Sequence, residues 1–236
     1  MKNGIDKMSL SLSFANSLKD ELFNTASDYV ELGLDSVLDD GLLKDVPLVS
    51  TVVALYKIGN SFKERHNIKK LYIFIDEINK RIVDENKLEE YKEKFKSNDN
   101  FRNQEIEYLL VLLDRYIDYN KPQMLAKLYL AYLDGVIIWE ELTMYAEVVD
   151  RFLLLDCGTL TSNGDRTIVP HNIGGESVLR LVALGLMTEI TDTSTFIEDG
   201  NGGYALSWGS LSRSRSLDKI YKRTEFGEKL SQILRE

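Results

Sequence analysis

Residues 45–82 read DVPLVSTVVALYKIGNSFKERHNIKKLYIFIDEINKRI, and this stretch decides which fold the chain can form. No charged residue lies between Asp45 and Lys57. Asp45 can cap a helix that has Pro47 in its first turn, because proline there loses no helical hydrogen bond. A helix that is apolar on every side is buried in protein or in lipid. We therefore expect a buried core helix at residues 46–58.

The apolar residues of this helix are also candidates for contact with a membrane or a partner. The uncharged stretch is far shorter than the roughly 20 residues that span a bilayer. Membrane contact would therefore require a conformational change that releases the helix. The candidates are Val46, Leu48, Val49, Val52, Val53, Leu55 and Tyr56.

The second half of the stretch has a helical period, although LYIFI alone resembles a strand. Its apolar residues recur in steps of three and four: Ile68, Leu71, Tyr72, Ile75, Ile78 and Ile82. Similar helical periods continue to about residue 152. Those up to residue 120 predict a helical bundle at residues 1–120. An aromatic stripe follows the burying face, which favours core packing over a ligand cage. Its members are Tyr129, Tyr132, Trp139 and Tyr145.

Composition and charge exclude several classes of protein. The chain has 236 residues and a net charge of −9, which argues against a general nucleic-acid coat and against constitutive binding to anionic membranes. The single cysteine, Cys157, excludes an internal disulfide. Residues 1–14 lack the continuous apolar core of a signal peptide. We expect a cytoplasmic protein.

No stretch of the sequence matches a familiar catalytic motif. A phosphate-binding loop, a Rossmann fingerprint and a nucleophile elbow are all missing. Cys157 and His171, with Asp156 nearby, could form a thiolate pair, but a packed thiol is the simpler reading, and His66 reads as a surface residue. We expect no enzyme activity, no cofactor and no metal.

Beyond Leu154 glycine, serine and threonine replace the glutamates and lysines of the helices. The order of elements resembles a winged-helix domain: a helix ending in Leu-Gly-Leu-Met at 184–187, a glycine-rich hairpin, and Tyr221, Thr224 and Gly227 leading into a closing helix. The resemblance implies a winged-helix-like α+β module at residues 121–236. Its expected elements are helices at about 122–134, 139–154 and 175–186, a β wing at about 187–208 and a closing helix at 224–235.

A winged helix usually suggests DNA binding through its third helix. Residues 121–236 hold 12 lysines and arginines against 16 aspartates and glutamates, a net charge of −4. Arg180 is the one basic residue of the third helix, and phosphate contacts dominate affinity for DNA. A second basic group could bind nucleic acid or line a partner surface: Arg213, Arg215, Lys219, Lys222 and Arg223. The acidic charge favours docking of a protein.

The N-terminal half resembles poorly characterised bacterial helical proteins, some of which are grouped with abortive-infection proteins of phage defence. The resemblance covers about residues 35–80. It rests on Lys44-Asp45-Val46-Pro47, on the apolar helix, and on Lys69, Lys70 and Phe74 at a slightly different spacing. It implies a bacterial or prophage setting and names no catalytic residue.

Three functional hypotheses follow for a mainly α protein with an N-terminal bundle and a C-terminal winged-helix-like module. The leading one is a non-enzymatic interaction or regulatory protein that docks a protein partner through the C-terminal module or associates with itself. The second is a membrane-active effector of abortive infection that releases the helix at 46–58. The third is a nucleic-acid-binding regulator that uses the basic segment 213–223.

Overall fold

The computed structural model describes residues 62–81, 85–162, 166–169, 175–190, 196–199, 203–206 and 219–235. These residues are mainly helical, as the sequence predicts. The expected core helix at 46–58 lies outside them. Close contacts divide the chain into two compact units, residues 1–151 and 152–236, whereas the sequence suggests a boundary at residue 120.

The described part of the first unit consists of helices. They are α5 (Phe62–Lys80), α6 (Glu85–Ser97), α7 (Asp99–Arg115), α8 (Asn120–Leu133) and α9 (Trp139–Arg151). The segment LYIFI lies inside α5, and Leu71, Tyr72 and Ile75 are buried there, in agreement with the helical period.

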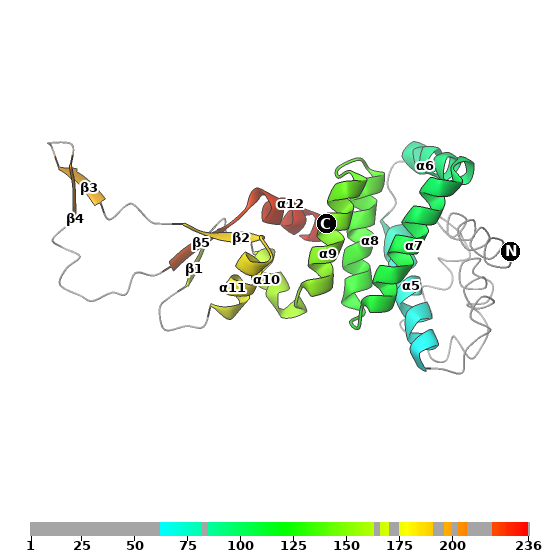
Figure 1. The fold of residues 1–236 in the computed structure, drawn as a ribbon, viewed down its shortest axis with the longest axis horizontal. Coiled ribbons are helices and arrows are strands. Elements are labelled where there is room, and N and C mark those ends of the chain that lie inside the picture. The colour runs from blue at the N-terminus through cyan, green and yellow to red at the C-terminus, as the bar shows by residue number, and fades with distance from the viewer. Residues whose placement is uncertain are drawn as a thin grey trace. The chain divides into compact units, whose positions relative to one another are not determined.

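Helix α8 lies at the centre of this unit. It packs against α5 on one side and against α9 on another, and it also contacts α6. Figure 1 shows α7, α8 and α9 side by side. Leu125, Leu128 and Tyr129 have no exposed surface. The helix ends at Leu133 and is followed by Gly135, whose φ of 73° suits glycine; the N–H of Val136 donates to the carbonyl of Ala131.

The second unit combines short helices with two small sheets. Its helical elements are η2 (Leu154–Asp156), α10 (Cys157–Leu160), α11 (Glu176–Ala183) and α12 (Glu225–Arg235). Its strands are β1 (Arg166–Val169), β2 (Met187–Ile190), β3 (Phe196–Asp199), β4 (Gly203–Leu206) and β5 (Lys219–Arg223).

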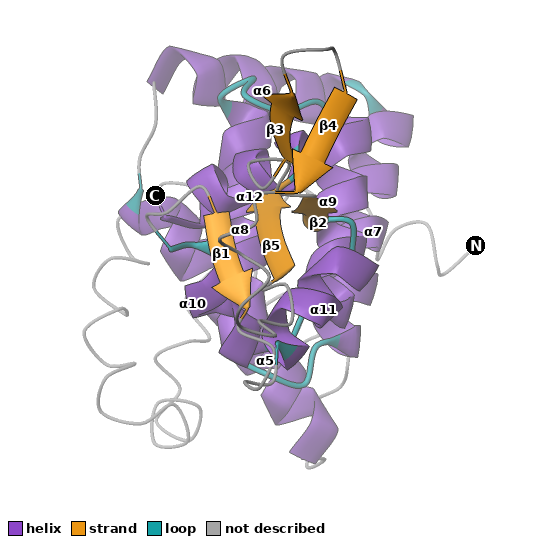
Figure 2. Cartoon of the chain, turned by 90° about the vertical axis from the view of Figure 1, so that its left-hand side faces the viewer, coloured by secondary structure: helices purple, strands orange, loops and turns teal. Residues whose placement is uncertain are grey.

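Strand β5 joins the beginning and the middle of the second unit. It pairs antiparallel with β1 on one edge and with β2 on the other, so the sheet order is β1-β5-β2 (Figure 2). Tyr221 faces Thr167 in one register and Glu189 in the other. Strands β3 and β4 pair with each other in a separate two-stranded sheet.

Candidate partner-binding surface

An ion pair anchors helix α11 to the segment that precedes the sheet. The Nε of Arg180 donates to Oδ2 of Asp156 at 2.8 Å, and its second terminal nitrogen donates to Oδ1 at 2.7 Å. Ser177 Oγ also donates to Oδ1, at 2.7 Å. Asp156 is buried, so the bidentate contact supplies the compensation that a buried carboxylate needs.

The charges of this pair stabilise each other. Hydrogen bonding to Arg180 holds the pKa of Asp156 below its ordinary value, against the opposing effect of burial. Hydrogen bonding to Asp156 raises the pKa of Arg180. The one basic residue of α11 is therefore engaged within the fold.

The other basic candidates do not gather on α11. Arg223 donates through one terminal nitrogen to the carbonyls of Leu160 and Ser162, both at 3.0 Å, and through Nε to Glu228. Lys222, on the same strand, is exposed. Lys219 opens β5 opposite Val169, and Arg213 and Arg215 lie outside the described residues.

Helix α11, described over its whole length, presents an apolar and acidic face. Its exposed residues are Glu176, Leu179 and Ala183, which follow one another in steps of three and four. Leu179 is 56% exposed, and Leu155 of the neighbouring η2 is 70% exposed. We call Glu176, Leu179 and Ala183 the α11 face.

The glycine motif after α11 and the threonine motif before α12 lock together. Gly185 has a φ of 74°. Thr224 donates its hydroxyl hydrogen to the carbonyl of Gly185 at 2.7 Å, and its N–H donates to the carbonyl of Leu186 at 3.0 Å. The N–H of Gly227 donates to Thr224 Oγ1 at 3.0 Å. This lock fixes where α11 ends and α12 begins.

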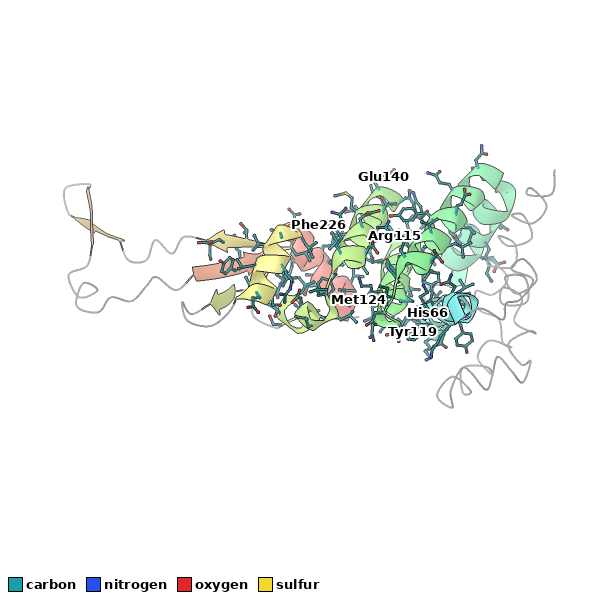
Figure 3. The ribbon with its side chains drawn as sticks, turned by 60° about the horizontal axis from the view of Figure 1, so that its bottom comes forward. His66, Arg115, Tyr119, Met124, Glu140 and Phe226 are labelled. Carbon is teal, nitrogen blue, oxygen red and sulfur yellow. The ribbon has the colours of Figure 1, made fainter. Side chains whose placement is uncertain are left out.

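In the first unit His66, Lys69 and Lys70 of α5 contact residues at and after the end of α7. Lys70 is fully buried, and its Nζ donates to the carbonyls of Asp114 and Tyr116 at the end of α7. Lys69 lies 4.4 Å from the centre of the Tyr119 ring. His66 Nδ1 lies 2.7 Å from the Tyr119 hydroxyl, and Figure 3 labels both residues.

A buried polar cluster crosses α6, α7 and α8. Tyr91 and Tyr129 donate their hydroxyls to Oε2 of Glu105 at 2.7 and 3.2 Å, and Tyr132 donates to Oε1 at 2.7 Å. Glu105 is 1% exposed. Burial, the largest cause, and the glutamate charge raise the pKa of all three phenols. The cluster ties three helices to one carboxylate.

The aromatic stripe packs as a core and not as a cage. The rings of Tyr132 and Trp139 meet edge to face at 5.6 Å, and those of Tyr108 and Trp139 do the same at 5.6 Å. In such a contact the edge of one ring covers the face of the other, where a cation would have to lie. Tyr129 and Tyr145 are buried.

The structure describes few of the remaining residues that the sequence offers as candidates. Cys157 opens α10, and His171 lies outside the described residues, as do all the apolar candidates of the segment 46–56. Within the described ranges no group of three histidine, cysteine, aspartate or glutamate side chains could hold a metal ion. No described helix is long and apolar enough to cross a membrane.

Sequence reasoning missed the two features that define this surface. The sequence places Asp156 beside Cys157, and nothing local indicates that it pairs with a residue 24 positions away. Leu179 is apolar, so its type alone does not indicate that it is exposed. Its spacing from Glu176 and Ala183, one turn on either side, was the available signal that it lies on the outer face.

Comparison of the chain with models of protein families, with curated proteins and with solved structures finds no match.

Proposed function

We propose that this protein is a non-enzymatic interaction protein whose residues 152–236 form a winged-helix-like module that docks a protein partner through the α11 face. The three-stranded order β1-β5-β2, with α11 leading into β2 and the β3–β4 hairpin between β2 and β5, supports the module. The lock of Gly185, Leu186, Thr224 and Gly227 joins the sequence features that carry the winged-helix resemblance.

The residues of the α11 face favour a protein partner over DNA. In a DNA-binding winged helix this helix enters the major groove and needs cations for the phosphates. Here Arg180 is bound to Asp156, and the face offers Glu176, Leu179 and Ala183. A leucine beside a carboxylate suits a protein surface that has an apolar pocket bordered by lysine or arginine.

The two alternatives draw less support. A nucleic-acid regulator would use the basic segment 213–223, and two of the basic candidates, Arg180 and Arg223, are engaged within the fold. A membrane effector would rely on the segment 46–56, which lies outside the described residues, and Lys70 in the helix that follows it is buried. The bacterial phage-defence setting rests on the resemblance at residues 35–80 alone.

The test compares retention of proteins by the wild-type chain and by Leu179→Arg, each used as bait in a bacterial lysate. The matched control is Ile117→Arg, because Ile117 is 87% exposed on the first unit. We expect a protein that is retained in stoichiometric amount by the wild type and the control and lost with Leu179→Arg. Equal retention by all three baits would contradict the proposal.

A duplex DNA of mixed sequence provides the second arm. We expect fluorescence anisotropy to show no binding at physiological salt. Binding that weakens steeply with salt, and weakens again in Lys222→Ala, would favour the nucleic-acid alternative.

A further inference from the structure

Helices α7 and α9 of the first unit run side by side in the same direction. The Tyr108 hydroxyl donates to the carbonyl of Thr143 at 3.2 Å, which joins the earlier part of α9 to the middle of α7. Arg115, at the end of α7, pairs with Asp150 and approaches Glu147 at 3.9 Å. These two cross-links hold the pair at both ends of a shared outer surface.

Two exposed apolar side chains lie between the cross-links. Val111 follows Tyr108 and precedes Arg115 by one turn, and it is 54% exposed. Met144 precedes Glu147 by one turn, and it is 57% exposed. A flexible methionine on a surface is well suited to fill an irregular contact with another protein.

One face of α9 carries opposite charges at its two ends. Glu140, Met144, Glu147 and Arg151 follow in steps of four, three and four, so they share one face of the helix. The spacing is the same when it is read backwards. The stripe begins with a carboxylate and ends with the guanidinium of Arg151, which is 71% exposed and lies 3.8 Å from the Glu147 carboxylate of the same helix. In Figure 3 Glu140 stands at the start of α9.

We propose that this face binds a second copy of the chain, with the two α9 helices antiparallel about a two-fold axis. Reversal places Glu140 opposite Arg151 of the second copy, and the symmetry makes this contact twice. The same reversal places Met144 opposite Glu147 of the second copy, where the methionine, with Val111 of α7 nearby, packs on the methylene groups of the glutamate. Arg115 lies near Glu147 within each copy, so the central carboxylate keeps a cation beside it.

The residues of the α9 stripe favour a second copy of the chain over a different partner. A two-fold interface uses the same patch on both subunits, so the patch must complement its own reversed image. The α9 stripe meets this condition in spacing and in the sign of its end charges. A partner of different sequence would place no such demand on the stripe.

The decisive experiment is a charge exchange followed by sedimentation of the full chain over a range of concentrations. Glu140→Lys alone and Arg151→Glu alone each place like charges opposite one another twice. Each single variant should weaken self-association about tenfold, on the scale of two exposed charge pairs. An equimolar mixture of the two should recover association, because each lysine or arginine then meets a glutamate.

Two further variants test the centre of the interface and a surface away from it. Met144→Lys should abolish self-association, while Ile117→Lys, on an exposed residue of the α7–α8 connection, should leave it unchanged. All four substitutions are at exposed or half-buried positions, and circular dichroism checks that the helices are kept. The proposal is overturned by a wild-type chain that stays monomeric, by charge variants that associate like the wild type, or by a mixture that does not recover.

Discussion

The backbone of Leu186 and the α-carbon of Gly227 approach so closely that no side chain fits between them. A Cβ added at Gly227 would lie 1.9 Å from the carbonyl oxygen of Leu186, and 2.7 Å from its carbonyl carbon. Residues 41 positions apart therefore meet at a point where glycine is required by space. The same carbonyl accepts the N–H of Thr224, so the backbone cannot move away without losing a hydrogen bond.

Gly227→Ala should destabilise the second unit by about 1–3 kcal/mol or more, because the clash is with backbone and not with a flexible side chain. Chemical denaturation followed by circular dichroism measures the free energy of unfolding. Gly158→Ala is the matched control, since a Cβ there meets nothing within 4 Å and the residue lies in helix α10. A Gly227→Ala protein as stable as the control would show that the close approach is not a property of the protein in solution.

Thr224→Val should cost about 1 kcal/mol of stability, the usual effect of losing a helix N-cap. Valine keeps the shape of the residue but loses both the acceptor for the Gly227 N–H and the donor to Gly185. Thr224→Ser keeps both hydrogen bonds and should restore most of the loss. Equal denaturation midpoints for the valine and serine variants would assign the effect to packing of the methyl group.

Raising the pH should unfold the first unit through its buried tyrosines. Burial is the largest cause of the raised pKa at each of Tyr91, Tyr108, Tyr116, Tyr129 and Tyr132. These phenols keep their protons in the folded chain but release them near pH 10 once unfolded, so stability is present below about pH 10 and is lost as the pH rises above it.

Tyrosinate absorbance and helical circular dichroism, recorded together, test this prediction. The chain has 12 tyrosines, and we expect the exposed ones to ionise first without loss of helix. The five phenols whose pKa is raised should ionise only as the helical signal disappears. Ionisation of all 12 with an intact helical signal would contradict the buried cluster around Glu105.

Acid should weaken the second unit through Asp156. Its pKa is lowered in the folded chain, chiefly by hydrogen bonding to Arg180, so its contribution is present above its ordinary pKa of 3.8 and is lost as the pH falls below it. Asp156→Asn should remove this acid dependence. Thermal melts between neutral and acidic pH compare it with the wild type.

Arg180→Ala should lower the melting temperature of the second unit more than Lys222→Ala does. The first substitution leaves a buried carboxylate without its bidentate cation, whereas Lys222 is exposed. Arg180→Lys should fall between the two, since a lysine cannot reproduce the two parallel hydrogen bonds. Equal melting temperatures for Arg180→Ala and Lys222→Ala would remove the anchoring role of the pair.

The features that can be predicted from this sequence are those that depend on a local helical period or on a nearby turn residue. Helix α5 follows from apolar residues in steps of three and four, and the ends of α8 and α11 follow from Gly135 and Gly185. The α11 face could also have been anticipated, because Glu176, Leu179 and Ala183 repeat at the spacing of one outer stripe. Each of these features depends on neighbours within two helical turns, so the linear order of residues contains it.

Tertiary structure alone decided which charges are available to a partner. In the sequence Arg180 and Lys70 are basic residues of helices with no indicated partner, yet Arg180 binds Asp156, and Lys70 is buried and donates to the carbonyls of Asp114 and Tyr116. Both outcomes depend on segments that are 24 to 46 residues apart in the chain and meet only after packing. A periodic pattern tells which side of a helix is covered, but it does not tell what covers it.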